Sequence, residues 1–278
     1  MIDLGSINTL SRGVALHPSM NWLRMDAEAV RTGCRRGARD IAVSTLALAL
    51  AAACLAGLLP TPSGSAAVEN RIWWSSSLRL RAIADVGKAL SAPLPDEFPV
   101  QVDGGEVSIR TCRDFLRIAT KSFDTEDDTD WNAIWYQGMR CLALDWLGKA
   151  KAPTKTFIGE LDWSKIELSD LPPELGLPIS PEETRSVKQA AAACKSLHDV
   201  EARARITRRK GDEITVSGAG WSGTITLLGR GDFDGDGVED LMVKRTGGVQ
   251  RGTAVESSLF LLTRTPDRGC VRVVRQVH

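Results

Sequence analysis

The most chemically specific stretch of the chain is Gly231–Leu241, in which acidic side chains recur at short intervals. Three alternating aspartates are followed by Gly237, and a fourth aspartate comes four residues after the third. Short carboxylates spaced in this way can surround one hard cation, and calcium takes about six to eight oxygen ligands. We therefore predict a Ca²⁺ site with four side-chain ligands and one backbone carbonyl, from Asp232, Asp234, Asp236, Asp240 and Val238.

The residues around this loop distinguish between two kinds of calcium site. An EF-hand needs a bidentate Glu at about the twelfth loop position, and counting from Asp232 that position is Val243. Apolar residues that are typical of strands precede and follow the loop, at 225–228 and 241–243. The sequence therefore predicts a calcium loop inside a β-hairpin. An Asp- and Gly-rich turn that binds no metal is the alternative.

The ligand spacing over Gly231–Val243 resembles the FG-GAP repeat, the D-x-D-x-D-G-x-x-D calcium loop of integrin α-subunit propellers and of many secreted bacterial proteins. The chain has one copy of this pattern, whereas a propeller needs several blades. The resemblance therefore implies a calcium-bearing hairpin and not a complete propeller.

Residues 1–67 have the composition of a secretory signal region. Several arginines between Arg31 and Arg39 precede the uninterrupted apolar run Ile41–Leu59, and the small residues Ser65-Ala66-Ala67 follow. A basic start, an apolar middle and a small-residue end are typical of a cleaved signal peptide, which predicts a mature N-terminus at Val68. The protein is then periplasmic or secreted.

Two other fates of this region remain open. The run 41–59 is just long enough to span a bilayer as an uncleaved anchor, or Cys54 could be lipidated after Ala51-Ala52-Ala53. Contact with a membrane is expected only in these two cases. Without residues 1–67 the chain has 29 basic and 31 acidic residues. That balance gives no electrostatic reason to expect nucleic acid as a partner.

Four cysteines remain after the signal region, an even number that is typical of exported proteins with disulfides. Their spacing is too wide for a zinc knuckle, and free buried thiols are the alternative. Three pairings are possible. We predict Cys112–Cys141, which would join adjacent helices, and Cys194–Cys270, which would tie the last helix to the last strand.

The first part of the mature chain, residues 68–200, is predicted to be mainly helical with one short hairpin. Apolar periodicity predicts helices over Ser77–Leu90 and Trp131–Leu147. Asp103-Gly104 between short alternating runs predicts the hairpin. The acidic run 124–130 is interpreted as a solvated loop that leads into a helix N-terminus, where acidic residues favour the dipole; a second cation site or a docking patch is the alternative. A long connector, 151–177, precedes the next helix start at Ser180.

From about residue 201 the period changes to two, which predicts strands. Close turns separate six of them, including the calcium loop 232–240 and a turn at Gly247-Gly248. Residues 201–278 are therefore predicted to form an antiparallel β-meander. The predicted fold is α+β, with the N-terminal helices covering one face of this meander.

The sequence contains no nucleophile elbow of Gly-x-Ser-x-Gly type and no phosphate-binding loop. We expect a non-enzymatic, calcium-stiffened module that binds a protein or a cell-envelope polymer. Two alternatives remain. One is a periplasmic inhibitor or immunity-type protein that uses the acidic run or the Pro-rich connector. The other is a hydrolase with a pair of catalytic carboxylates.

Overall fold

The computed structural model describes residues 72–277, except 159–160, 254 and 265–268. All described residues belong to one compact unit. The predicted signal region 1–67, with the run 41–59 and Cys54, lies outside the described residues. Within the described part, no helix combines the length and the apolar character needed to cross a bilayer.

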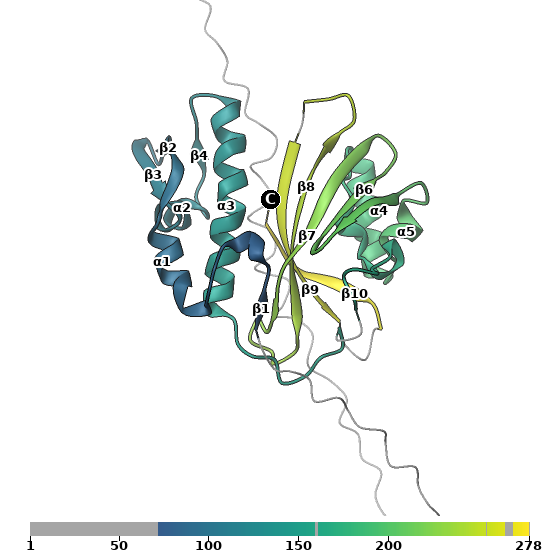
Figure 1. The fold of residues 1–278 in the computed structure, drawn as a ribbon. Coiled ribbons are helices and arrows are strands. Elements are labelled where there is room, and N and C mark those ends of the chain that lie inside the picture. The colour runs from purple at the N-terminus through teal and green to yellow at the C-terminus, as the bar shows by residue number, and fades with distance from the viewer. Residues whose placement is uncertain (1–71, 159–160, 254, 265–268, 278) are drawn as a thin grey trace, which may run out of the picture. The chain divides into compact units, whose positions relative to one another are not determined.

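Seven strands form the large antiparallel sheet, in the order β10-β9-β8-β7-β6-β5, with β1 paired to β7. Its strands are β1 (Trp73–Trp74), β5 (Arg205–Lys210), β6 (Glu213–Ser217), β7 (Trp221–Gly231), β8 (Asp240–Val249), β9 (Val255–Arg264) and β10 (Val271–Val277). Each strand from β5 to β10 pairs with its neighbour in sequence. The predicted meander is therefore confirmed (Figure 1).

The predicted turn at Gly247-Gly248 is wrong, because β8 continues to Val249. Gly247 lies opposite Gly223 of β7, and a Cβ on Gly247 would come within 3.1 Å of the Gly223 Cα atom. These glycines therefore allow two backbones to approach closely within the sheet. The chain reverses after β8, where Arg251 adopts a positive φ of 65°.

A second sheet contains three strands in the order β3-β2-β4. Strands β2 (Pro93–Val102) and β3 (Gly105–Thr111) form the predicted hairpin, and its turn residues Asp103 and Gly104 both have positive φ. The short strand β4 (Phe123–Asp124) pairs with β2. It extends the hairpin in a way that the sequence pattern does not predict, because a two-residue strand has no detectable period.

The predicted helix over 77–90 is wrong in its first half. Two single 3-10 turns, η2 (Ser76–Leu78) and η3 (Ile83–Asp85), precede a short helix α1 (Val86–Ser91). Arg79 adopts a left-handed conformation with φ 56° and ends the first turn. The 3-10 turns already bury Leu78, one of the apolar residues in this stretch. Burial of Leu78 therefore does not require a continuous helix.

Two capped helices follow, α2 (Cys112–Ile118) and α3 (Asp128–Lys149). The Thr111 hydroxyl accepts a hydrogen bond from the Asp114 amide and caps α2. The Asp127 carboxylate accepts one from the Asp130 amide and caps α3. The acidic run 124–130 thus leads into a helix N-terminus, as the sequence predicts.

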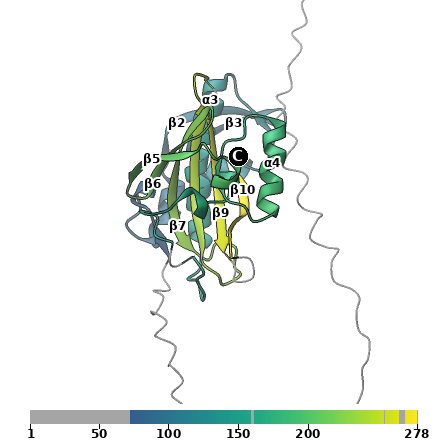
Figure 2. The ribbon, with the colours of Figure 1, turned by 90° about the vertical axis from the view of Figure 1, so that its right-hand side faces the viewer.

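Both faces of the large sheet are covered, whereas the sequence predicts cover on only one face. On one face, Met242, Leu259 and Leu261 pack with α3 and the small sheet. On the other, Val243, Phe260 and Leu262 pack with the connector and with Leu197 of α5. Figures 1 and 2 show α3 on one side of the sheet and α4 and α5 on the other.

The second layer is built from short elements: η4 (Leu168–Asp170), η5 (Pro173–Leu175), α4 (Pro181–Ala192) and α5 (Leu197–Val200). Between them the connector buries Ile158, Trp163 and Ile166 against the sheet. These side chains and the apolar face of the sheet are removed from water together. Their burial therefore holds the connector in place, although its sequence has no regular spacing of apolar residues.

Both predicted disulfides are present. Cys112–Cys141 joins α2 to α3, and both cysteines are fully buried. Cys194–Cys270 joins the segment after α4 to the start of β10, and Cys194 is exposed. The two bridges therefore stabilise different layers of the molecule.

Candidate metal centre

The acidic loop connects the ends of β7 and β8, whose last pairing is Gly231 with Asp240. The predicted hairpin around the loop is therefore confirmed. Gly237 has φ 83°, a conformation that side chains disfavour. A Cβ there would come within 3.0 Å of the Thr154 hydroxyl oxygen. The loop thus needs glycine at this position, both for its backbone turn and for its contact with the connector.

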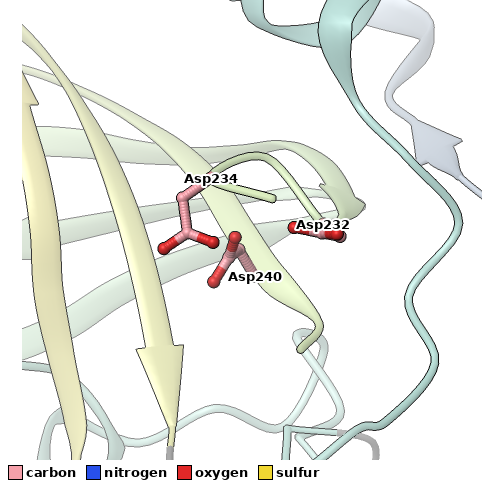
Figure 3. A group of neighbouring side chains, drawn as sticks. All are labelled: Asp232, Asp234 and Asp240. Carbon is pink, nitrogen blue, oxygen red and sulfur yellow. The ribbon is translucent and has the colours of Figure 1, made fainter. Parts of the chain in front are cut away.

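Three of the four predicted carboxylates come together. Oxygen atoms of Asp232, Asp234 and Asp240 lie within 4.8 Å of one another (Figure 3). Asp236 is not in this group; its carboxylate accepts a hydrogen bond from the Val238 amide at 2.7 Å. The Val238 carbonyl accepts no hydrogen bond from the described residues, so it remains available as a ligand. Ligation by Asp236 and Val238 stays a prediction.

Asp240 is the buried member of the group, with 0% of its surface exposed. Its Oδ2 accepts a hydrogen bond from the Phe233 amide at 3.1 Å, whereas its Oδ1 has no hydrogen-bond partner among the described residues. Burial raises the pKa of the Asp240 carboxyl to about 7, and the negative charges of Asp234 and Asp236 act in the same direction, whereas the Phe233 amide and the Thr263 hydroxyl on β9 lower this pKa. This carboxylate therefore lacks a counter-charge.

Asp232 is also buried, and its carboxylate shapes the loop. Its Oδ1 accepts a hydrogen bond from the Gly235 amide at 2.6 Å, and its Oδ2 accepts one from the Gly237 amide at 3.1 Å. A carboxylate oxygen has two lone pairs, so each can accept an amide hydrogen and still face a cation. Asp232 can therefore hold the loop closed and contribute a ligand at once.

The donor set fits a hard divalent cation. In the described part of the chain, no Lys or Arg forms an ion pair with any of the four loop aspartates. Carboxylate oxygens in this irregular arrangement suit Ca²⁺, which accepts irregular geometry. Mg²⁺ demands a near-ideal octahedron and holds its water. Asp232, Asp234 and Asp240 would hold the ion, which would supply the missing positive charge.

A neighbouring segment, Lys151–Thr156, clamps the loop from outside. The amides of Thr154 and Lys155 both donate hydrogen bonds to the Gly237 carbonyl, at 2.9 and 3.1 Å. Lys151 and Asp232 exchange two backbone hydrogen bonds, at 2.9 and 3.0 Å. The sequence pattern contains no signal for this contact, because backbone hydrogen bonds depend little on residue type.

Glu239 lies inside the loop but contacts other residues. Its carboxylate forms an ion pair with Arg230 at 3.2 Å and accepts a hydrogen bond from the Thr156 hydroxyl. Arg230 in turn donates to the Ile158 carbonyl at 3.3 Å. The sequence predicts that Glu239 points away from the ligand set, and the contacts of its carboxylate agree with that prediction.

The structure gives little support to carboxylate catalysis. A cavity of about 150 Å³ lies beside the Cys194–Cys270 disulfide and is bordered by Lys195, Arg264 and one carboxylate, that of Asp170. Glycoside hydrolysis needs two carboxylates across the scissile bond, and this cavity supplies one. Within the described residues, His198 is exposed on α5, and no hydrogen bond joins its side chain to a serine.

Comparison of the chain with protein-family models, with curated proteins and with solved structures finds no match. The resemblance of Gly231–Val243 to the FG-GAP loop therefore stays a prediction.

Proposed function

We propose that the protein is an exported, non-enzymatic binding module whose sheet is held in shape by Ca²⁺ in the loop 232–240. The observation that carries this proposal is the Asp240 carboxylate, which is buried, has an unpartnered oxygen and faces two further carboxylates. A cation relieves their repulsion and replaces the hydration that Asp240 loses on burial.

The position of the loop explains how one ion can affect the whole fold. The loop joins the two strands at the centre of the sheet, β7 and β8. Its backbone is also bonded to Lys151–Thr156, which follows α3 and begins the connector. An ordered loop therefore fixes the sheet, the helix and the connector relative to one another. Such a role favours a structural ion over a catalytic one.

The direct test is thermal unfolding of the purified protein in millimolar Ca²⁺ and in chelator. Extracellular modules bind Ca²⁺ with a Kd of roughly 0.1–1 mM. At about tenfold excess over Kd the free energy of unfolding rises by about 1.4 kcal/mol. Mg²⁺ at the same concentration should give a smaller rise, since it demands a near-ideal octahedron and holds its water.

Asp234→Ala, which removes one carboxylate of the group, is expected to abolish the calcium response, whereas Glu239→Gln should lower stability and keep the response. The control is informative because Glu239 is in the same loop and its carboxylate is bound to Arg230 instead. Equal melting temperatures of the wild-type protein in Ca²⁺ and in chelator would mean that the loop is a turn without a metal.

A further inference from the structure

One face of the large sheet carries an ordered array of hydroxyl groups. The strand pairings place residues from five strands, β5 to β9, in three rows across this face. The middle row is Arg208, Thr215, Thr224, Thr246 and Ser257. Two further rows flank it. The first contains Arg205, Ser217, Ser222, Gly248 and Val255. The second contains Lys210, Glu213, Thr226, Lys244 and Leu259. Directly paired residues of antiparallel strands project from the same face.

Independent contacts support this arrangement. The hydroxyl oxygens of Thr246 and Ser257 lie 3.1 Å apart, as expected for paired residues on one face. A β-bulge falls between Ile206 and Arg208. The extra residue shifts the alternation by one, so that Arg205 and Arg208 project from the same face although they are three positions apart.

Apart from Leu259, the residues of the three rows lie outside both apolar cores. On this face, β7, β8 and β9 contribute four residues to the core under α3, and these lie towards the calcium-loop end of the strands. They are Leu228, Met242, Leu259 and Leu261. The hydroxyl residues occupy the opposite end and are half-buried or exposed. Five strands about 4.8 Å apart and three rows about 6.8 Å apart give a platform of about 19 by 14 Å.

Basic residues border one edge of the platform and occupy one position in an outer row. Arg205, Arg208 and Lys210 form its outer edge on β5, and all three are exposed. At the other side, the Lys244 ammonium nitrogen lies 3.9 Å from the ring centroid of Tyr136 on α3, whose side chain is 51% exposed. Glu213 is the one acidic residue in the three rows. The three rows thus carry four basic residues and one acidic residue, and burial lowers the pKa of one of the four, Lys244, to about 8.

We propose that this face binds an anionic polysaccharide. Rows of hydroxyl groups can donate to and accept from sugar hydroxyls, and the basic residues at both sides can pair with carboxylate or sulfate groups. Tyr136 offers an exposed aromatic ring at the boundary of the platform. This inference rests on the proposed function, because it names the ligand class of the binding module.

Other anionic partners fit the platform less well. A bound peptide needs pockets for alternate side chains, and the middle row presents small hydroxyl residues in their place. Single-stranded nucleic acid needs several aromatic rings for base stacking, and Tyr136 is a single ring. Charged edge strands also prevent unwanted strand pairing. This explains the basic residues on β5 but does not explain the middle row, in which hydroxyl residues continue from β6 to β9.

Carboxymethyl-dextran is a suitable probe, with uncharged dextran and polyglutamate as comparisons. We expect the purified protein to bind carboxymethyl-dextran more tightly than either comparison, and to lose most of that binding in about 0.5 M salt, which screens exposed charges. The double variant Arg205→Ala/Arg208→Ala should weaken binding about tenfold or more. Thr224→Val removes a hydroxyl at nearly constant volume and should weaken it several-fold.

Arg185→Ala on α4 is the matched control, because Arg185 is equally exposed and lies on another layer. It should bind as the wild-type protein does. Three results would each overturn the proposal. The first is that Arg185→Ala weakens binding as much as the double variant does. The others are that polyglutamate or single-stranded DNA binds as tightly as carboxymethyl-dextran, and that carboxymethyl-dextran does not bind. The calcium melting test is run on the same variants. A normal calcium response with no glycan binding rejects this surface alone, whereas loss of the calcium response in the wild-type protein rejects the metal site.

Discussion

Asp240 and Arg245 are two buried charged residues on β8, and they differ in the number and charge of their partners. Arg245 is 1% exposed and donates to the carbonyls of Glu174 and Gly176 and to the Glu256 carboxylate. Asp240 has one amide donor and no cation. A buried charge is stable when it is paired, and Arg245 is paired with Glu256, although its Nε has no hydrogen-bond partner among the described residues. Asp240 has no basic side chain as a partner, and the cation that we propose for the loop would supply that charge.

Asp240→Asn is expected to stabilise the protein in chelator and to remove its response to Ca²⁺. Burial raises the pKa of Asp240 from 3.8 to about 7, so between these values the folded state retains a proton that the unfolded state releases. The free energy of unfolding therefore falls as pH rises through this window, and the loss is complete above it. At about pH 8 the variant should be more stable by on the order of 2 kcal/mol.

Chemical denaturation of both proteins in chelator, from about pH 4 to pH 8, measures this difference. The variant should show a smaller decline across the window, because an amide does not titrate. A wild-type protein that is as stable as the variant at every pH would contradict the assignment of Asp240 as an uncompensated buried carboxylate.

At the scale of elements, the connector is attached to the sheet by specific contacts and not by regular structure. Arg245 reaches from β8 to the carbonyls of η5, and Arg230 reaches from β7 to Ile158. Arg209 of β5 adds an ion pair with Glu167 at 3.0 Å. These three arginines come from β8, β7 and β5, so together they hold the connector across much of the width of the sheet.

Arg245→Ala is expected to lower the free energy of unfolding by about 3 kcal/mol or more. Removing the guanidinium leaves the Glu174 and Gly176 carbonyls without their donor and leaves a cavity between β8 and η5. Urea denaturation measures the loss. Arg185→Ala, which removes an exposed pair with Glu182 on α4, should change stability by no more than about 0.5 kcal/mol. A similar small effect for Arg245→Ala would show that burial alone holds the connector.

At the scale of the whole molecule, the two disulfides close loops of different length and differ in exposure. Cys112–Cys141 spans 29 residues and is fully buried, whereas Cys194–Cys270 spans 76 residues and has an exposed Cys194. In the chain-entropy model, the longer loop stabilises the fold by about 4 kcal/mol. The more stabilising bridge is therefore also the more accessible one.

We predict that a small dithiol reduces Cys194–Cys270 first, because the attacking thiolate must reach a sulfur atom. Timed reduction, followed by alkylation and peptide mass spectrometry, should label Cys194 and Cys270 before Cys112 and Cys141. The partly reduced protein should melt at a lower temperature. Labelling of the buried pair first would mean that the helical layer opens more readily than the second layer.

The export prediction also concerns the whole molecule. The basic, apolar and small-residue segments of residues 31–67 predict a mature protein that begins near Val68. Mass spectrometry of the N-terminal peptide from the native host measures this directly. A lipid on Cys54 would favour the lipoprotein alternative, and a chain that begins at Met1 and remains in the cytoplasm would refute export.

The sequence by itself determined the features that depend on local chemistry. Alternation and turn residues predicted the meander, the capping residue Ser180 predicted a helix start, and the aspartate spacing predicted an acidic loop between strands. Each of these follows from residues within a few positions of one another. The disulfide pairing was predicted correctly from the helices and strand on which the cysteines lie.

Only the tertiary structure decided the features that depend on packing between distant segments. The unbroken apolar run Leu259–Leu262 indicates that β9 is buried on both faces. It does not reveal that the connector is the segment that covers the second face of the sheet. The clamp of Lys151–Thr156 on the acidic loop uses backbone groups, which carry no sequence signal. The hydroxyl rows exist because strand register and one bulge align residues from five strands, and register is a property of the assembled sheet.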